Sequence, residues 1–253
     1  MAHFPLIKDL PQVIDSTGWN WQIYNTPSFP SKQFWLGTDL HGNKWLTKLR
    51  GSFYAYREIV FAKLAQKMGW SCQSSIFLKL DKKSAELFNV NQKEIHAAHW
   101  FLIEHQEACS QHCPFNKLVK PKRINDIEST EILHIMDWPK SDIAAYLFGA
   151  NECSDHIFTT NHEFVIIDSE QMFAVDPCPI SKTGWWERCE GEPSIEEIAF
   201  WRRVCLDIDS LSPSDIEIAL AIPNGVSIKL LWPISEKIGK TIKYAHEFLD
   251  VYS

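Results

Sequence analysis

Residues 42–60 read GNKWLTKLRGSFYAYREIV and place an apolar strand pattern directly before a helical pattern. Lys48 stands near the end of the strand pattern, and Glu58 follows ten residues later in the helical one. A lysine on a sheet above a nucleotide neutralises phosphate charge, and a glutamate on the adjacent helix holds that lysine in position. A surface lysine and a helix glutamate that never meet would give the same spacing. The functional interpretation is that Lys48 binds phosphates and Glu58 positions Lys48.

The sequence on either side of this segment predicts a strand-rich first half and a helical end. Two strands are expected at 34–36 and 44–49, joined by a turn at 39–43. A helix is expected over 54–68 from its three- and four-residue apolar spacing, ended by Gly69. The other expectations are an irregular lead-in over the first thirty residues, strands at 76–80 and 100–103 with a helical or irregular stretch between them, helical segments at 127–136 and 142–147, strands at 156–158 and 164–167, and three helices after residue 194.

Two aspartates lie at the ends of the hairpin expected from 156–158 and 164–167. Asp168 directly follows the apolar run of the second strand, and Asp155 directly precedes the first. If these strands pair, their outer ends converge and the two carboxylates can share a Mg²⁺ ion that bridges phosphates. The alternatives are a strand-ending aspartate that caps a turn and a solvated loop acid.

In chain order, the lysine, the glutamate and the two aspartates resemble the pattern of the HipA-like kinases. Residues 42–51, 56–60 and 64–70 look like the N-lobe of that family, with a strand that ends in lysine and a helix with an early glutamate. Residues 165–170 with Phe173 are similar to the family's leucine-isoleucine-aspartate-histidine metal motif. The resemblance covers roughly residues 34 to 175, and the phosphatidylinositol kinases share its broader layout.

The resemblance implies an ATP site, with Mg²⁺ held by Asp155 and Asp168. Lys48 and Glu58 would bind the nucleotide, and Glu104 would lie where a strand leads into the adenine-binding hinge. The implied fold is α+β and two-lobed, protein kinase-like, with a strand-rich N-lobe and a mainly helical C-lobe. We expect one domain over 1–253, divided into an N-lobe of about 1–104 and a C-lobe of about 105–253.

The expected catalytic loop departs from the kinase pattern. A kinase of this type needs an aspartate beside the acceptor hydroxyl and an asparagine five residues later for the second metal ion. The asparagine position falls at or beside Asp155, and the aspartate position then falls at Ala150, between Gly149 and Asn151. The remaining candidates for the catalytic role are Asn151, Glu152 and Ser154.

Two main functions therefore stay open. The first is a HipA-like kinase that transfers the γ-phosphoryl group of ATP to a Ser or Thr hydroxyl of a protein substrate. The alternative is a pseudokinase, a regulatory module that binds a nucleotide or a protein partner without phosphoryl transfer. The intact Lys, Glu and Asp set favours the first, and the missing acid favours the second. A lipid-kinase-like activity is a third, less favoured interpretation.

A zinc site is the competing interpretation of a different segment. Cys109, His112 and Cys113, with His105 close by, are residue types that bind Zn²⁺. Their intervals are cramped for a pair of ligand knuckles, and no second clean pair follows. Thiols and imidazoles without a metal are the favoured interpretation.

Composition sets the remaining expectations. The 253 residues carry a formal net charge of −7 and no long Lys or Arg run, so we expect no nucleic-acid binding. No segment approaches the about 20 apolar residues of a membrane helix, and residues 1–5 do not resemble a secretory signal. Seven scattered cysteines favour reduced thiols, hence a cytoplasmic protein without membrane contact.

Overall fold

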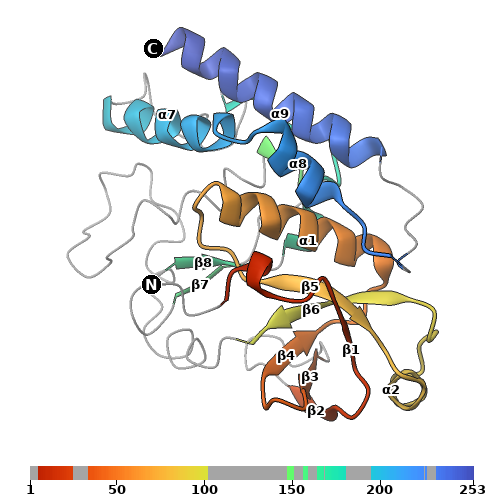
Figure 1. The fold of residues 1–253 in the computed structure, drawn as a ribbon. Coiled ribbons are helices and arrows are strands. Elements are labelled where there is room, and N and C mark those ends of the chain that lie inside the picture. Colours follow the sequence, from red (N-terminus) through yellow and green to blue (C-terminus); the bar gives the residue numbers. More distant parts are fainter. Residues whose placement is uncertain are drawn as a thin grey trace.

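The structure is a computed structural model that describes residues 5–24, 34–101, 147–150, 156–158, 164–167, 169–180, 195–224, 226 and 232–253. A six-stranded sheet forms one end of the molecule, in the order β1-β5-β6-β4-β3-β2 (Figure 1). β1 pairs with β5 in parallel, and the other neighbours are antiparallel. The strands are β1 (Val13–Asp15), β2 (Asn20–Tyr24), β3 (Phe34–Thr38), β4 (Lys44–Thr47), β5 (Ser75–Lys79) and β6 (Ile95–Trp100).

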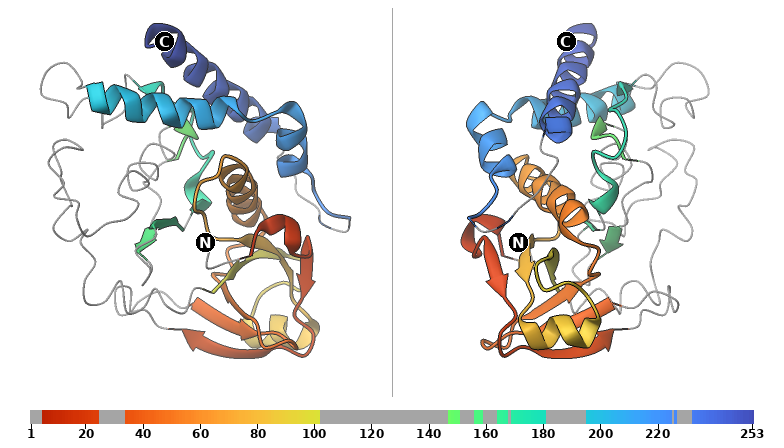
Figure 2. Two further views of the ribbon diagram at one scale, coloured as in Figure 1. Left: turned by 60° about the vertical axis from the view of Figure 1, so that its left-hand side comes forward. Right: turned by 90° about the vertical axis from the view of Figure 1, so that its right-hand side faces the viewer.

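Helices complete the architecture. α1 (Ser52–Lys67) lies between the sheet and the C-terminal helices, and the two turned views agree on this arrangement (Figure 2). A short hairpin, β7 (His156–Phe158) with β8 (Phe164–Ile166), leads to the turn η4 that packs on α1. The remaining elements are η1 (Ile7–Asp9), α2 (Lys82–Phe88), η4 (Ser169–Gln171), α7 (Ile195–Asp209), α8 (Pro213–Leu220) and α9 (Trp232–Val251).

The two faces of the sheet carry different side chains because successive strand residues point to opposite faces. On one face Leu46 is flanked by Leu36 of β3 and His99 of β6. This is the face that α1 covers, since Phe77 of β5 is paired with Ala97 and stacks on Tyr56 of α1.

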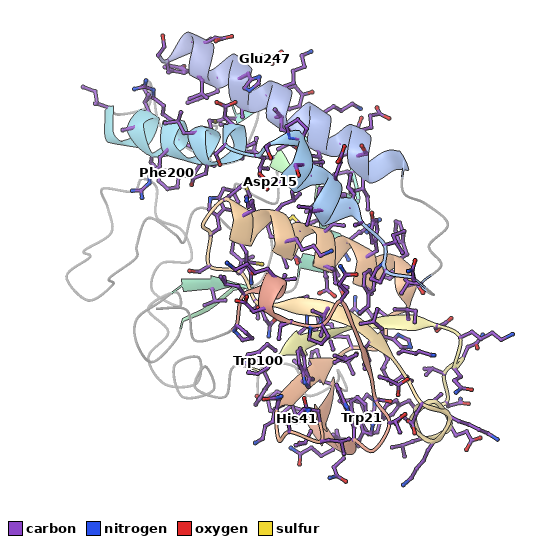
Figure 3. All side chains as sticks on the ribbon, viewed as in Figure 1. Trp21, His41, Trp100, Phe200, Asp215 and Glu247 are labelled. Atoms are coloured by element: carbon purple, nitrogen blue, oxygen red, sulfur yellow. The ribbon has the colours of Figure 1, made fainter. Side chains whose placement is uncertain are left out.

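The other face carries a row of indole rings. On four neighbouring strands, the residues that pair directly across the sheet at this level are Trp21, Gly37, Trp45 and Trp100. The rings of Trp45 and Trp100 meet edge to face with centroids 5.1 Å apart, and Trp19 stacks on Trp45. A Cβ atom at Gly37 would lie 2.5 Å from the ring of Trp19, so the indoles pack directly on the backbone there. Trp21 and Trp100 are labelled on the sheet in Figure 3.

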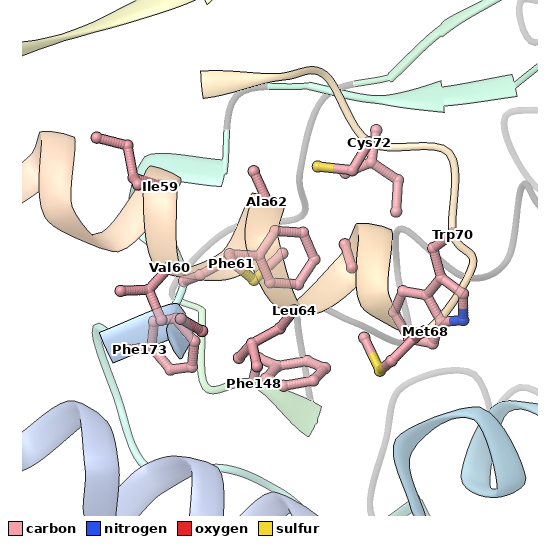
Figure 4. Packing of buried hydrophobic residues seen from close by; sticks show 14 of the residues in the cluster. Ile59, Val60, Phe61, Ala62, Leu64, Met68, Trp70, Cys72, Phe148 and Phe173 are labelled. Carbon is pink, nitrogen blue, oxygen red and sulfur yellow. The ribbon is translucent and has the colours of Figure 1, made fainter. Parts of the chain in front are cut away.

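α1 forms the centre of a core shared by both halves of the chain. Gly51, with φ of 84°, precedes its first turn, and Gly69, with φ of 76°, follows its end as the sequence predicts. Phe61 meets Phe148 edge to face at 5.4 Å, and Phe148 meets Phe173 at 5.9 Å (Figure 4). The buried cluster extends without a break from the sheet to the C-terminal helices.

The prediction of an irregular lead-in is wrong, because η1, β1 and β2 all lie within the first thirty residues. The prolines fall beside these short elements and not within them, so they delimit strands without excluding them. The strand prediction at 100–103 is wrong for Phe101, because β6 spans Ile95–Trp100, and residues 102–103 lie outside the described residues. The central alanines and histidines of β6 lack the usual strand composition, and pairing with β5 and β4 on both sides decides the conformation.

The other element predictions have mixed outcomes. The strands near 34, 44, 76, 156 and 164, the helix near 54 and the three C-terminal helices are confirmed. The helical segment predicted at 127–136 lies outside the described residues, and of the one predicted at 142–147 only Leu147 is described. Within the described parts of the chain, none of the helices is long and apolar enough to cross a membrane.

Candidate functional site

Lys48 and Glu58 meet between the end of β4 and the second turn of α1. The ammonium Nζ of Lys48 lies 3.6 Å from Oε1 of Glu58, and the two side chains are 12% and 4% exposed. Leu49 and Gly51 both have positive φ, 53° and 84°, and this tight link turns the chain from the strand into the helix. The structure therefore brings together the two residues that the sequence pairs, while their role with a nucleotide stays a prediction.

Glu58 also contacts a histidine on its other side. Nε2 of His99 lies 3.3 Å from Oε2 of Glu58, and Nδ1 of His99 is hydrogen-bonded to the hydroxyl of Ser75 at 2.8 Å. Burial by itself would raise the pKa of Glu58, but the charges of His99 and Lys48 outweigh burial, and the pKa lies well below its ordinary value. The Glu58 side chain is therefore a buried anion between the Lys48 ammonium and the His99 imidazole.

Glu170 is a second buried carboxylate on Lys48. Its Oε2 lies 3.7 Å from Nζ of Lys48, and its Oε1 forms a short ion pair with Arg50. The backbone carbonyl of Glu170 accepts a hydrogen bond from Nη1 of Arg57 at 3.3 Å. The Arg57 guanidinium lies over the ring of Phe53, 4.0 Å from its centroid, so Arg57 is a structural anchor for η4.

Lys48, Arg50 and Glu58 line a small pocket of about 10 Å³ that is open to solvent, between the end of β4, the start of α1 and β6. Two cations and a carboxylate face the same space, an arrangement suited to a phosphate-bearing ligand. The lining residues are Lys48, Leu49, Arg50, Gly51, Tyr54, Ala55, Glu58, Ala97 and His99.

Sequence reasoning missed Arg50, His99, Ser75 and Glu170 as parts of this site. His99 and Ser75 face Glu58 only because β5 and β6 pair in one register. Arg50 and Glu170 both lie inside segments that the sequence singled out, two residues after Lys48 and two after Asp168. This shared spacing of two residues was the feature of the sequence that could have indicated Arg50 and Glu170.

The other predicted site residues all lie outside the described residues. This applies to the metal ligands Asp155 and Asp168, to Glu104, and to the catalytic candidates Asn151, Glu152 and Ser154. The zinc candidates Cys109, His112 and Cys113 lie outside them as well. Among the residues that the structure does describe, no group of three or more His, Cys, Asp or Glu side chains could hold a metal ion.

The position without an acid is partly described. The N–H of Val175 donates to the carbonyl of Gly149 at 2.8 Å, and Gly149 has φ of 66°. A Cβ atom at Gly149 would collide with the carbonyl oxygen of Val175. Packing and backbone conformation both require glycine at position 149, and the next residue, where the kinase pattern places the aspartate, is Ala150.

Comparison of the sequence with protein-family models and with curated proteins gives no match. The fold does match that of a solved structure, the proinflammatory kinase CtkA of Helicobacter pylori. The match has a TM-score of 0.53 and 12% sequence identity, and it covers 96% of this chain and 100% of that one. At this identity the likeness concerns the fold alone. The chain has a kinase-like α+β fold, with a strand-rich N-terminal part and a mainly helical C-terminal part.

Proposed function

We propose that this chain is a HipA-like kinase that binds ATP with Mg²⁺ and transfers the γ-phosphoryl group to a Ser or Thr hydroxyl of a protein. The observation that carries the proposal is the buried contact of 3.6 Å between Lys48 and Glu58. In protein kinases a lysine on the third strand pairs with a glutamate of the following helix, and this ion pair holds the nucleotide phosphates. Here β4 is the third strand of the antiparallel run β2-β3-β4, and α1 follows it directly.

Each residue has a separate task in this proposal. Lys48 neutralises phosphate charge, and Glu58, fixed from behind by His99, keeps the Lys48 ammonium in place. Asp155 and Asp168 are the proposed ligands of Mg²⁺, since carboxylate oxygens suit this ion. Bound Mg²⁺ would supply neutralisation of the charge that develops on the phosphates. Glu104 is proposed to lie beside the adenine.

A pseudokinase is the second candidate, and one observation favours it. Ala150 stands where the kinase pattern places the catalytic aspartate, and Gly149 before it packs so closely on Val175 that no acid fits there either. Without a carboxylate near the acceptor hydroxyl, the cleft would bind a nucleotide or a protein partner and not transfer phosphate. Asn151, Glu152 and Ser154 remain the candidates for an unusual catalytic group.

The test compares the purified wild type with Lys48→Met and Asp168→Ala. Thermal stabilisation by ATP is measured with and without Mg²⁺, and transfer of the γ-phosphate is followed on the protein itself and on a cell lysate. The matched control is Lys93→Met, because Lys93 is an exposed lysine in a turn. We expect Mg²⁺-dependent stabilisation in the wild type and the control, and its loss in the two site variants.

The outcomes separate the candidates. Stabilisation with phosphate transfer supports the kinase, and stabilisation without transfer supports the pseudokinase. Absence of stabilisation in the wild type would contradict the nucleotide site itself.

A further inference from the structure

We propose that Arg50 is a second phosphate-binding cation beside Lys48, and that the Glu170 carboxylate occupies this pair until a phosphate group replaces it. The inference rests on the proposed nucleotide site and adds two residues to it. It concerns the recognition of the phosphate chain, whether or not the chain transfers phosphate.

The first support is the geometry of Glu170, which spans the two cations. One carboxylate oxygen contacts Nζ of Lys48 at 3.7 Å, and the other pairs with Nη1 of Arg50. Arg50 and Lys48 both line the cavity at the start of α1. A carboxylate that bridges a lysine and an arginine stands where a phosphate with the same two contacts would bind.

Access to the site also differs between the cations. The Arg50 side chain is 37% exposed, so an incoming anion can meet it from solvent, whereas Lys48 is 12% exposed. A guanidinium presents parallel N–H donors that match two phosphate oxygens, while an ammonium acts as a point charge. Arg50 would therefore meet the phosphate first, and Lys48 would complete the contact inside the cavity.

The second support is the difference between the two buried carboxylates. Glu58 is held by Lys48 on one side and by His99 on the other, and His99 is itself bonded to Ser75. The carboxylate of Glu170 contacts cations that line the cavity, and its backbone carbonyl is fixed separately by Arg57. The contacts of the Glu170 carboxylate are thus separate from the contact that holds its backbone, and Glu170 is the carboxylate that we propose to exchange.

Charge explains why the exchange has to occur. While Glu170 is in place, its carboxylate occupies the two cations that a phosphate group would use. A phosphate bound on the same two cations would be repelled by the carboxylate of Glu170 at close range. Nucleotide binding thus competes with the ion pairs of Glu170.

The experiment is isothermal titration of ATP, with and without Mg²⁺, into the wild type, Glu170→Gln, Arg50→Gln and Lys48→Met. Glutamine keeps the size of Glu170 and removes its charge. We expect Glu170→Gln to bind Mg²⁺-free ATP about tenfold more tightly and Arg50→Gln to bind it about tenfold more weakly, the scale of one charge-assisted contact. The matched control is Glu247→Gln, an exposed α9 glutamate far from the sheet (Figure 3), which should leave the affinity unchanged.

Unfolding midpoints of all variants are measured in parallel, and Arg50→Gln keeps the proposal testable if Glu170→Gln fails to fold. Equal or weaker ATP binding by folded Glu170→Gln would overturn the exchange. A loss of binding seen only with Mg²⁺ would also overturn it and would make Glu170 a metal ligand. Unchanged binding by Arg50→Gln would remove Arg50 from the phosphate site. If Lys48→Met alone loses binding, the proposed function stands and this inference falls. If the wild type does not bind ATP, both fall.

Discussion

At the scale of single residues, the candidate site is an arrangement of buried charges in which no carboxylate depends on one partner. Glu58 is the clearest case, because His99 and Lys48 contact its two oxygens from opposite sides. Removing one cation from a buried carboxylate strongly destabilises a protein, because the charge of the carboxylate is then left without compensation. Because Glu58 has His99 as a second partner, the nearly buried pair of Lys48 and Glu58 can form before any ligand binds.

His96 gives a pH dependence that can be measured without a ligand. Its Nδ1 accepts a hydrogen bond from the backbone N–H of Gly51 at 3.1 Å, so the ring is neutral there, and burial lowers the pKa of His96 to about 4. The folded-state pKa lies below the unfolded value of about 6.5, so the unfolded chain binds the proton more readily. The contribution of the neutral His96 ring to the free energy of unfolding should therefore be fully present above pH 6.5. The free energy of unfolding should fall by up to about 3 kcal/mol as the pH drops towards 4.

Urea unfolding at a series of pH values checks this expectation, with His96→Gln as the comparison. The variant should lose much of the slope between pH 6.5 and 4.5, where the depressed pKa of Glu58 contributes little because Glu58 titrates at lower pH. The exposed His246 on α9 offers the control substitution His246→Gln, which should keep the slope attributed to His96. An unchanged slope in His96→Gln would show that another group carries the acid sensitivity.

At the scale of elements, the sheet depends on close packing of tryptophan rings on Gly37. Gly37→Ala should lower the free energy of unfolding by about 2 kcal/mol, because the added methyl group would overlap the rings of Trp19 and Trp21. Gly239→Ala is the matched control: Gly239 is exposed inside α9 and has open space around it. That control should stabilise the protein by about 0.5 to 1 kcal/mol through helix propensity. Chemical denaturation measures both, and a neutral Gly37→Ala would mean that the indole row is loosely packed.

The elements also show how far a single sequence can be interpreted. Strong local patterns predicted β4, α1, the β7–β8 hairpin and the C-terminal helices. β1, β2 and most of β6 were missed because their conformation comes from pairing with other strands, and β6 has a weak strand composition. The same reason limits the site. Lys48 and Glu58 are near in sequence and were paired in advance, whereas His99 and Glu170 reach them only through tertiary structure.

At the scale of the whole molecule, α1 belongs to both halves of the chain. Tyr56 donates a hydrogen bond to the carbonyl of Leu220 at 2.8 Å, and Lys67 pairs with Asp215 at 2.8 Å. The indole of Trp70, just after α1, donates to Asp207 of α7 at 2.8 Å. The helix that carries Glu58 is thus fixed by the C-terminal helices as well as by the sheet. The sequence predicts one domain with two lobes, about 1–104 and about 105–253. We therefore expect the two lobes to unfold together, in one cooperative transition.

Phe148→Ala tests this cooperativity, because Phe148 packs on Phe61 from one side and Phe173 from the other (Figure 4). Loss of the fully buried ring should cost about 3 to 5 kcal/mol. Because the core is continuous, hydrogen exchange in urea should show the sheet and α9 losing protection at the same, lowered denaturant concentration. Leu206→Ala on the exposed face of α7 is the control and should change the free energy of unfolding by less than about 0.5 kcal/mol. Two separate transitions, with only one of them shifted by Phe148→Ala, would instead show that the lobes fold independently and that α1 belongs to one of them.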